Sequence, residues 1–405
     1  MEALPRFRTR RSGRHGSLVL LAGLIVVLTM ALAAPASSSA SLKRWGQYFG
    51  GGETQTQAEP TPVTGLEHVT AIDAGNATSY ALESNGVVYA WGDGMYGQLG
   101  DGRYGQLANS PTPVRVSFPN GVSIVAIGEA RDAGYAVDST GQGWAWGSNN
   151  HGSLCLGYSP VLRRRPEKVS GVTTAKAVQG GQNHVLWLLN NGTVESCGSN
   201  MQGQLGVGSG VQESNVPLLV PGITGIVRVS VGEHTSAAID SSGRLFMWGG
   251  NETGAVGVGQ KYRDVYTPMQ VQFPSGAGPV TDVSAGGDFG ENDHTLALLG
   301  GEMYGWGVDS RNQVGDEEMS DGSGENKFEP VATGLHFTQV VAGGMHSLGL
   351  DATGNVWAWG AGYGFALGTG SSKAAVSPVI VDTGVRVISA TATNSIDSSE
   401  GSMGG

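Results

Sequence analysis

The feature that most constrains this 405-residue chain is a repeat of about fifty residues. Its landmark is an aromatic pair, Trp-Gly, which one unit replaces by Cys-Gly. The intervals between successive copies are 46, 55, 51, 51, 58 and 53 residues. The pairs are Trp45-Gly46, Trp91-Gly92, Trp146-Gly147, Cys197-Gly198, Trp248-Gly249, Trp306-Gly307 and Trp359-Gly360. A period near fifty with strand-like content is typical of a propeller blade or a similar stacked unit.

Each unit has the same internal order of strands and turns. An apolar strand, such as residues 69–74, ends at a glycine, and a second short strand follows, as at residues 79–82. A Ser-Asn-Gly or Ser-Ser-Gly turn then leads into the strand with the aromatic pair, and such turns suit the positive φ angles of a tight hairpin. Glycine supplies 68 residues, and because many recur at fixed positions they favour a folded repeat over a disordered chain.

A second motif begins six residues after the aromatic pair in several units. The clearest copies are Gly97-Gln98-Leu99-Gly100, Gly203-Gln204-Leu205-Gly206 and Gly254-Ala255-Val256-Gly257. Together the two motifs resemble the regulator of chromosome condensation (RCC1) repeat family over about residues 61–391. The resemblance implies an all-β fold, a seven-bladed β-propeller with four-stranded blades.

The last unit is split between the two ends of the chain. Residues 387–390 match the opening strand of the other units, but the chain ends before another aromatic strand appears. The missing strand is near the N-terminus, at Arg44-Trp45-Gly46. We therefore expect strands from both termini to close the last blade, which removes the exposed sheet edges that invite aggregation.

The first 36 residues have the three parts of a secretory signal peptide. Five arginines lie between residues 6 and 14, an uncharged apolar run covers residues 18–34, and Ala34-Pro35-Ala36 offers small residues for cleavage. The apolar run also approaches the length of a membrane span, so an uncleaved anchor is the alternative. Both readings predict a propeller outside the cytosol, either secreted or at the cell surface, or anchored in a membrane.

The charge of the remaining chain bears on its partners. Residues 37–405 carry 18 basic and 33 acidic residues, a formal charge of −15. Such a surface repels a phosphate backbone, so we expect no nucleic-acid partner. No second apolar run is long enough to span a bilayer, so membrane contact is expected only through the N-terminal segment. We divide the chain into residues 1–36, signal peptide or anchor, residues 37–60, linker and closing strand, and residues 61–405, the RCC1-like propeller.

Three patterns could suggest a cofactor or a metal. Residues 92–97 fit the glycine spacing of a dinucleotide site, but no helix is expected after them to hold the pyrophosphate. Residues 316–326 gather carboxylates, which Ca²⁺ prefers, but in no known loop spacing. One histidine per unit follows the first strand in four units: His184, His234, His294 and His346. We expect these histidines to bond turns, the acidic loop to be solvated, and no cofactor or metal to be bound.

The two cysteines break the repeat in neighbouring units. Cys155 takes the place of the last glycine in one second motif, and Cys197 takes the place of the tryptophan in the next unit. In an exported protein such a pair forms a disulfide or remains as two buried thiols. Arg163, Arg164 and Arg165 form a basic cluster that either docks an acidic partner or stays a solvated loop.

Catalytic signatures are missing from the sequence. It has no Gly-x-Ser-x-Gly elbow, no His-Glu-x-x-His and no phosphate-binding loop with its lysine. We predict a non-enzymatic, monomeric domain that binds another protein through its variable loops, as an interaction scaffold or a protein inhibitor. An extracellular hydrolase acting on carbohydrate is an alternative that rests on fold analogy alone. The resemblance also implies a guanine-nucleotide exchange regulator, which the export signal and the negative charge disfavour.

Overall fold

The computed structural model divides the chain into two units, residues 1–38 and residues 39–405. The structure describes residues 42–50, 53–75, 77–158, 161–259, 263–287, 293–316, 326–390 and 394–398. Within these ranges no helix has the length and apolar character needed to cross a membrane. The predicted signal peptide or anchor and most of the acidic loop, residues 317–325, lie outside the described residues.

The strands form seven four-stranded antiparallel sheets, six of which are built from consecutive strands. The first sheet contains β3 (Val69–Ala74), β4 (Thr78–Glu83), β5 (Val88–Gly92) and β6 (Ser110–Arg115). The second contains β7 (Ile124–Ala130), β8 (Ala133–Asp138), β9 (Gly143–Ser148) and β10 (Leu162–Lys168). The third contains β11 (Ala175–Gly180), β12 (His184–Leu189), β13 (Val194–Ser199) and β14 (Glu213–Leu219).

The next three sheets follow the same order. The fourth contains β15 (Ile226–Val231), β16 (Thr235–Asp240), β17 (Leu245–Gly249) and β18 (Val265–Gln270). The fifth contains β19 (Val280–Ala285), β20 (His294–Leu299), β21 (Glu302–Gly307) and β22 (Lys327–His336). The sixth contains β23 (Gln339–Ala342), β24 (His346–Leu350), β25 (Val356–Gly360) and β26 (Ala375–Asp382). Three short 3₁₀ helices lie in the loops: η1 (Gln106–Ala108), η2 (Asn150–Gly152) and η3 (Tyr363–Phe365).

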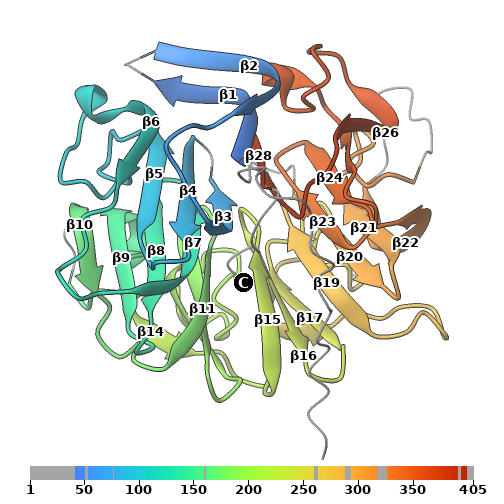
Figure 1. The fold of residues 1–405 in the computed structure, drawn as a ribbon. Coiled ribbons are helices and arrows are strands. Elements are labelled where there is room, and N and C mark those ends of the chain that lie inside the picture. Colours follow the sequence, from blue (N-terminus) through green and yellow to red (C-terminus); the bar gives the residue numbers. More distant parts are fainter. Residues whose placement is uncertain are drawn as a thin grey trace, which may run out of the picture. The chain divides into compact units, whose positions relative to one another are not determined.

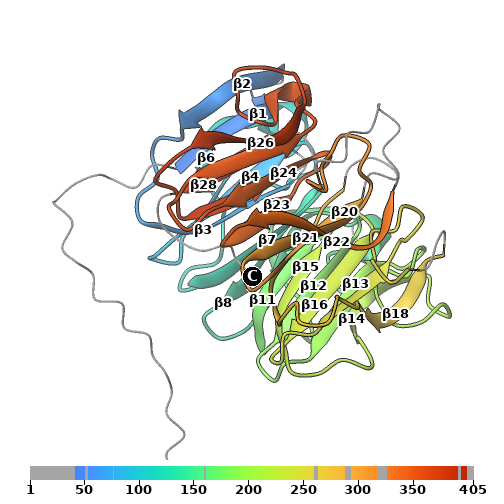
Figure 2. The same cartoon turned by 90° about the vertical axis from the view of Figure 1, so that its right-hand side faces the viewer.

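The sheets are arranged around a common centre (Figure 1). Each first strand contacts the first strands of its two neighbours, in the order β3, β7, β11, β15, β19, β23, β27 (Val387–Ala390) and back to β3. The view turned by 90° shows the sheets from the side of this ring (Figure 2). The prediction of an all-β propeller with four-stranded blades is confirmed.

The terminal sheet is made from both ends of the chain, in the order β2 (Glu53–Pro62), β1 (Leu42–Gly50), β28 (Asn394–Ser398), β27. In the β1–β28 ladder Trp45 stands opposite Ser395. The N-terminal part contributes two strands to this sheet, and the boundary predicted at residue 61 falls inside β2. Sequence inspection missed β2 because an outermost strand has no buried face, and its residues are mostly polar.

Neighbouring sheets are joined by a contact between the two repeat motifs. The indole Nε1–H of a tryptophan donates to the backbone carbonyl oxygen of the second motif residue in the preceding sheet. The five pairs are Trp146 to Gln98 (2.7 Å), Trp248 to Gln204 (2.9 Å), Trp306 to Ala255 (2.8 Å), Trp359 to Gln313 (3.0 Å) and Trp45 to Ala366 (2.9 Å). All five rings are fully buried. The terminal sheet therefore joins its neighbour by the same contact as the internal sheets.

The glycines of the two motifs are required by this packing. Gly206, the last residue of its motif, has a φ of +71°, and an added Cβ would lie 2.8 Å from Nε1 of Trp248. Gly249, directly after that tryptophan, has a φ of +112°, and an added Cβ would lie 2.2 Å from the backbone oxygen of His234. A side chain at either position would meet both steric overlap and an unfavourable backbone conformation. The recurrence of both motifs thus has one physical cause.

Candidate functional site

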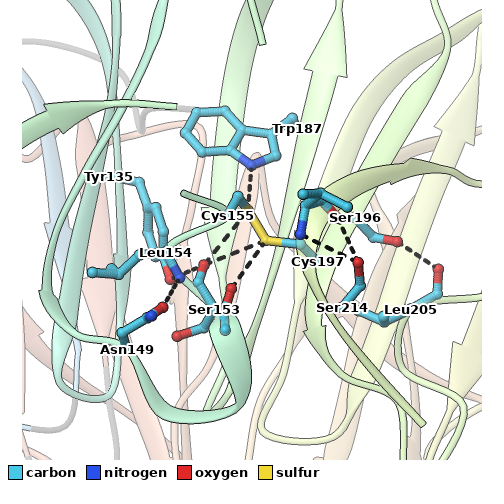
Figure 3. The surroundings of a disulfide bond; sticks show 12 residues. Tyr135, Asn149, Ser153, Leu154, Cys155, Trp187, Ser196, Cys197, Leu205 and Ser214 are labelled. Carbon is cyan, nitrogen blue, oxygen red and sulfur yellow. Dashed lines mark hydrogen bonds between the residues drawn. A yellow bond between two sulfur atoms is a disulfide. The ribbon is translucent and has the colours of Figure 1, made fainter. Parts of the chain in front are cut away.

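The junction between the second and third sheets differs from the others, because a disulfide joins Cys155 and Cys197 (Figure 3). Their Cα atoms are 5.8 Å apart and both side chains are fully buried. Cys155 has a φ of +57°, as expected for a residue in a glycine position. Its Cβ is accommodated because the next sheet presents Cys197 where the other sheets present a tryptophan ring. The sequence left two alternatives, a disulfide or two buried thiols. The structure contains the disulfide.

The centre of the ring opens into a mouth lined by residues of all seven first strands or the turns after them. In an antiparallel sheet the turn after the first strand and the loop after the third strand lie at the same end. The mouth therefore shares one face of the ring with the loops between the third and fourth strands. These include the variable loops through which the sequence predicts binding. Charged residues of both signs line it: Asp73, Glu129, Arg131, Arg228 and Glu233.

Two carboxyl groups lie close together in this mouth, that of the half-buried Asp73 and that of the buried Glu129. Asp73 accepts the backbone N–H of Ala74 at 2.9 Å and of Glu129 at 3.0 Å, one on each carboxylate oxygen. Glu129 is 6% exposed, and its carboxyl group packs onto Gly75, where an added Cβ would lie 1.5 Å from an oxygen. Burial raises the pKa of Asp73 to about 7, and burial together with the charge of Asp73 raises the pKa of Glu129 well above its usual range. The protonated form of Glu129 is therefore favoured in the folded protein.

The predicted arginine cluster lies on β10, the outermost strand of the second sheet. The backbone oxygen of Arg164 accepts the N–H of Gly102 from the first sheet at 2.9 Å. The same contact recurs between Gly208 and Tyr266, at 2.8 Å. The backbone of the cluster is thus part of a repeated junction, and only its side chains distinguish it from the other outermost strands.

Those side chains meet tyrosines from two loops. The guanidinium carbon of Arg164 lies 4.6 Å from the ring centroid of Tyr104, and that of Arg163 lies 5.0 Å from the ring centroid of Tyr158. Arg163 is also paired with Glu167. Exposed apolar side chains stand on the same two loops: Met95, Tyr96, Leu107 and Val161. We call these four residues, the two tyrosines and Arg163, Arg164 and Arg165 the Arg-Tyr patch.

The histidines behave differently from the prediction. Three of them begin the second strand of a sheet and are buried: His184, His294 and His346. Nε2 of His184 lies 3.0 Å from Oγ of Ser236 in the next sheet, and this hydroxyl donates to the carbonyl of Gln204, so the imidazole is the donor. Nε2 of His294 lies in the same way 2.9 Å from Oγ of Ser347, so His184 and His294 bond to the next sheet rather than within a turn. His234 stands one residue earlier, because Thr235 begins β16 in the fourth sheet.

Sequence reasoning missed the acidic residues at the mouth. Glu129 and Glu233 each directly follow the glycine that ends the first-strand motif, Gly128 or Gly232. In three other sheets this position is a second glycine, at Gly181, Gly287 and Gly344. A carboxylate at a position where other units have glycine was the available signal.

With this geometry established, two family models match the chain. The RCC1-like domain model matches residues 28–291, and the regulator of chromosome condensation (RCC1) repeat model matches residues 337–364. The chain belongs to the RCC1-like domain family. The two matched ranges include Trp45, Trp146, Trp248 and Trp359 of the tryptophan junctions.

Several characterised proteins are similar to this RCC1-like chain. The ultraviolet-B receptor UVR8 of Arabidopsis thaliana is 29% identical over 77% of this chain and 70% of its own length. The regulator of chromosome condensation of Mus musculus is 32% identical over 42% of this chain and 39% of its own length. The probable E3 ubiquitin-protein ligase HERC6 of Homo sapiens is 32% identical over 51% of this chain, and the chain spans 20% of that ligase.

Solved structures share the fold. Human WBSCR16 superimposes with a TM-score of 0.78 at 18% identity, covering 90% of this chain and 100% of the other. Yeast Prp20p, from Saccharomyces cerevisiae, superimposes with a TM-score of 0.76 at 21% identity, covering 90% of this chain and 92% of Prp20p. At these identities the likeness establishes the propeller fold.

Proposed function

We propose that this chain is a non-catalytic, monomeric propeller that binds another protein outside the cytosol, and that the Arg-Tyr patch is its contact surface. The observation that carries the proposal is the stacking of Arg164 on Tyr104 beside Leu107, whose side chain is 96% exposed. Arginine, tyrosine and methionine are enriched where proteins bind one another, and a large apolar residue this exposed is available as an anchor.

The chemistry of the patch favours an acidic partner. Arg164 and Arg165 are exposed, and Arg165 has no ion pair among the described residues. The rest of the chain is acidic, since residues 37–405 carry a formal charge of −15. An acidic protein is therefore repelled by most of the surface and attracted to this local basic cluster. A closed wheel of seven blades would hold the loops of the patch rigidly, which lowers the entropic cost of binding.

Two observations support a site of action outside the cytosol. Residues 1–36 have the composition of a signal peptide or an anchor. The disulfide between Cys155 and Cys197 is of the kind that persists in oxidising compartments. A similar fold is known to bind proteins, since Prp20p has been solved together with a study of its binding to Gsp1p and histones.

The alternative of a carbohydrate hydrolase is less well supported by the channel mouth. A glycosidase needs two carboxyl groups that reach a substrate. Asp73 has each oxygen bonded to a backbone N–H, and Glu129 is buried against Gly75. An exchange factor for a guanine-nucleotide-binding protein, the second alternative, would have its partner in a different compartment from the one proposed here.

A site-specific crosslink tests the proposal. A photo-crosslinking amino acid at Leu107 is expected to capture a discrete acidic protein from culture medium or cell envelope. The same amino acid at Ile380, which is 50% exposed on β26 of the sixth sheet, is expected to capture none. Replacing both Arg164 and Arg165 by alanine should reduce capture at Leu107 at least tenfold. Equal capture at the two positions, or capture that survives the arginine substitutions, would reject the patch as the contact surface.

A further inference from the structure

A cluster of metal-ligating side chains stands beside the channel mouth, outside the Arg-Tyr patch. Glu233 and His234 lie in the turn between β15 and β16, and Asp293 directly precedes β20 in the next sheet. One ligand atom from each residue lies within 4.8 Å of the other two. Two neighbouring sheets thus bring two carboxylates and an imidazole to one place.

One carboxylate oxygen of Asp293 is buried without a hydrogen-bond partner among the described residues. The residue is 4% exposed, and its Oδ2 accepts the backbone N–H of His234 at 3.3 Å. The oxygen that lacks a partner within the described part of the chain is Oδ1. Gly287 provides the space for this oxygen, since an added Cβ there would lie 1.9 Å from it. A buried carboxylate oxygen without a partner is costly, and proteins satisfy such atoms with a proton, a water molecule or a cation.

The surrounding charges favour a cation. The carboxyl group of Glu233 lies next to that of Asp293, so the two acidic side chains repel each other when both are ionised unless a positive charge lies between them. The side-chain amide of Gln182 donates to Oε1 of Glu233 and holds that carboxylate in place. Nδ1 of the His234 imidazole lies 3.9 Å from Oδ2 of Asp293. Two carboxylate oxygens and an imidazole nitrogen complement a doubly charged ion.

We propose that Glu233, His234 and Asp293 bind one divalent transition-metal ion of the Zn²⁺ class at the channel mouth. Imidazole nitrogen and carboxylate oxygen are both good Zn²⁺ ligands, whereas Ca²⁺ prefers oxygen alone. The ligand atoms come within about 2.1 Å of a bound Zn²⁺, so the three side chains close inward by roughly 1 Å. Glu233 lines the mouth and the side chain of His234 is 19% exposed, so the ion has a path from solvent. Three protein ligands leave a fourth position open to water or to a group of a bound partner.

Zinc titration of the full exported chain, stripped of metal by a chelator, tests the site. Calorimetry is expected to show one equivalent of Zn²⁺ bound with a Kd in the micromolar range or below. Asp293→Asn and His234→Ala are each expected to weaken binding at least about 100-fold. His151→Ala is the matched control, because His151 is an exposed histidine beside Glu213, outside the cluster, and it should bind as the unmodified chain does.

Two results would overturn the metal site. One is the absence of stoichiometric Zn²⁺ binding by the unmodified chain. In that case a proton shared by the carboxyl groups of Glu233 and Asp293 would explain how the two lie next to each other. The other is unchanged binding in both variants. Circular dichroism checks that each variant is folded, and if Asp293→Asn does not fold, the half-buried His234→Ala variant decides the question alone. The crosslinking experiment at Leu107 does not depend on this outcome.

Discussion

Two junctions of the wheel solve one packing problem with different chemistry. At the junction of the third and fourth sheets, the ring of Trp248 lies against Gly206 and donates a hydrogen bond to the carbonyl of Gln204. At the junction of the second and third sheets, Cys155 and Cys197 occupy the glycine and tryptophan positions and are covalently bonded. The comparison teaches that the tryptophan and the last glycine pack against each other, and that at this junction both positions are replaced together.

The terminal sheet offers a third case. Trp91, in the sheet that follows it, is fully buried, but its indole N–H has no hydrogen-bond partner among the described residues. No complete second motif follows Trp45 in the sequence, and none of the described residues supplies the carbonyl acceptor of the other junctions. Within the described residues this junction thus keeps the aromatic packing without the hydrogen bond.

Removal of a tryptophan should have the largest effect on stability. Trp306→Ala deletes a fully buried ring and its hydrogen bond to Ala255, and we expect a loss of about 4–5 kcal/mol in the free energy of unfolding. Denaturant unfolding followed by tryptophan fluorescence measures the loss. A change below about 1 kcal/mol would show that the tryptophan contact does not hold the sheets together.

Removal of the disulfide should have the next largest effect. Cys155→Ser with Cys197→Ser opens a loop whose ends are 42 residues apart, for which about 2–4 kcal/mol is expected. Denaturant unfolding of this variant, compared with the oxidised chain, gives the value. A variant as stable as the oxidised chain would mean that the disulfide adds nothing to its junction.

Replacement of a buried carboxyl group at the channel mouth should raise the free energy of unfolding, whereas the changes at the junctions lower it. Glu129→Gln mimics the protonated form that the folded state favours, so a gain of roughly 1–3 kcal/mol is expected at pH 8. In the unmodified chain, the free energy of unfolding falls as the pH rises from the pKa of Glu129 in the unfolded state toward its raised pKa in the folded state. The gain from Glu129→Gln should therefore fade near pH 4. Thermal melts at both pH values measure it, with the exposed Glu252→Gln as control. A gain that is independent of pH would contradict the assignment.

The smallest effect is expected on β10. Arg164→Ala with Arg165→Ala leaves the backbone bond from Gly102 intact, so stability should change by no more than about 0.5 kcal/mol. The same variant should lose partner capture at Leu107. A large loss of stability would instead assign the arginine side chains to the junction.

The sequence predicted what the repeat determines and missed what depends on distances between sheets. Trp45 could be recognised near the N-terminus because it begins a Trp-Gly pair, and the repeat buries this pair at the junctions between sheets. The outer strand β2 could not, since its polar residues have no period that a buried face would impose. The stacking of Arg164 on Tyr104 joins β10 of the second sheet to a loop of the first, and a linear sequence does not give the distance between them. The approach of Asp293 to Glu233 was missed for the same reason.

A double-mutant cycle at the disulfide junction tests most directly whether the two cysteines replace one glycine-tryptophan pair. Cys155→Gly, Cys197→Trp and their combination are unfolded in denaturant under reducing conditions, beside the reduced parent chain. Cys197→Trp alone should be strongly destabilised, since its ring meets the Cβ of Cys155, and the combined variant should recover at least about 2 kcal/mol of that loss. A combined variant no more stable than the sum of the two single changes predicts would contradict the account.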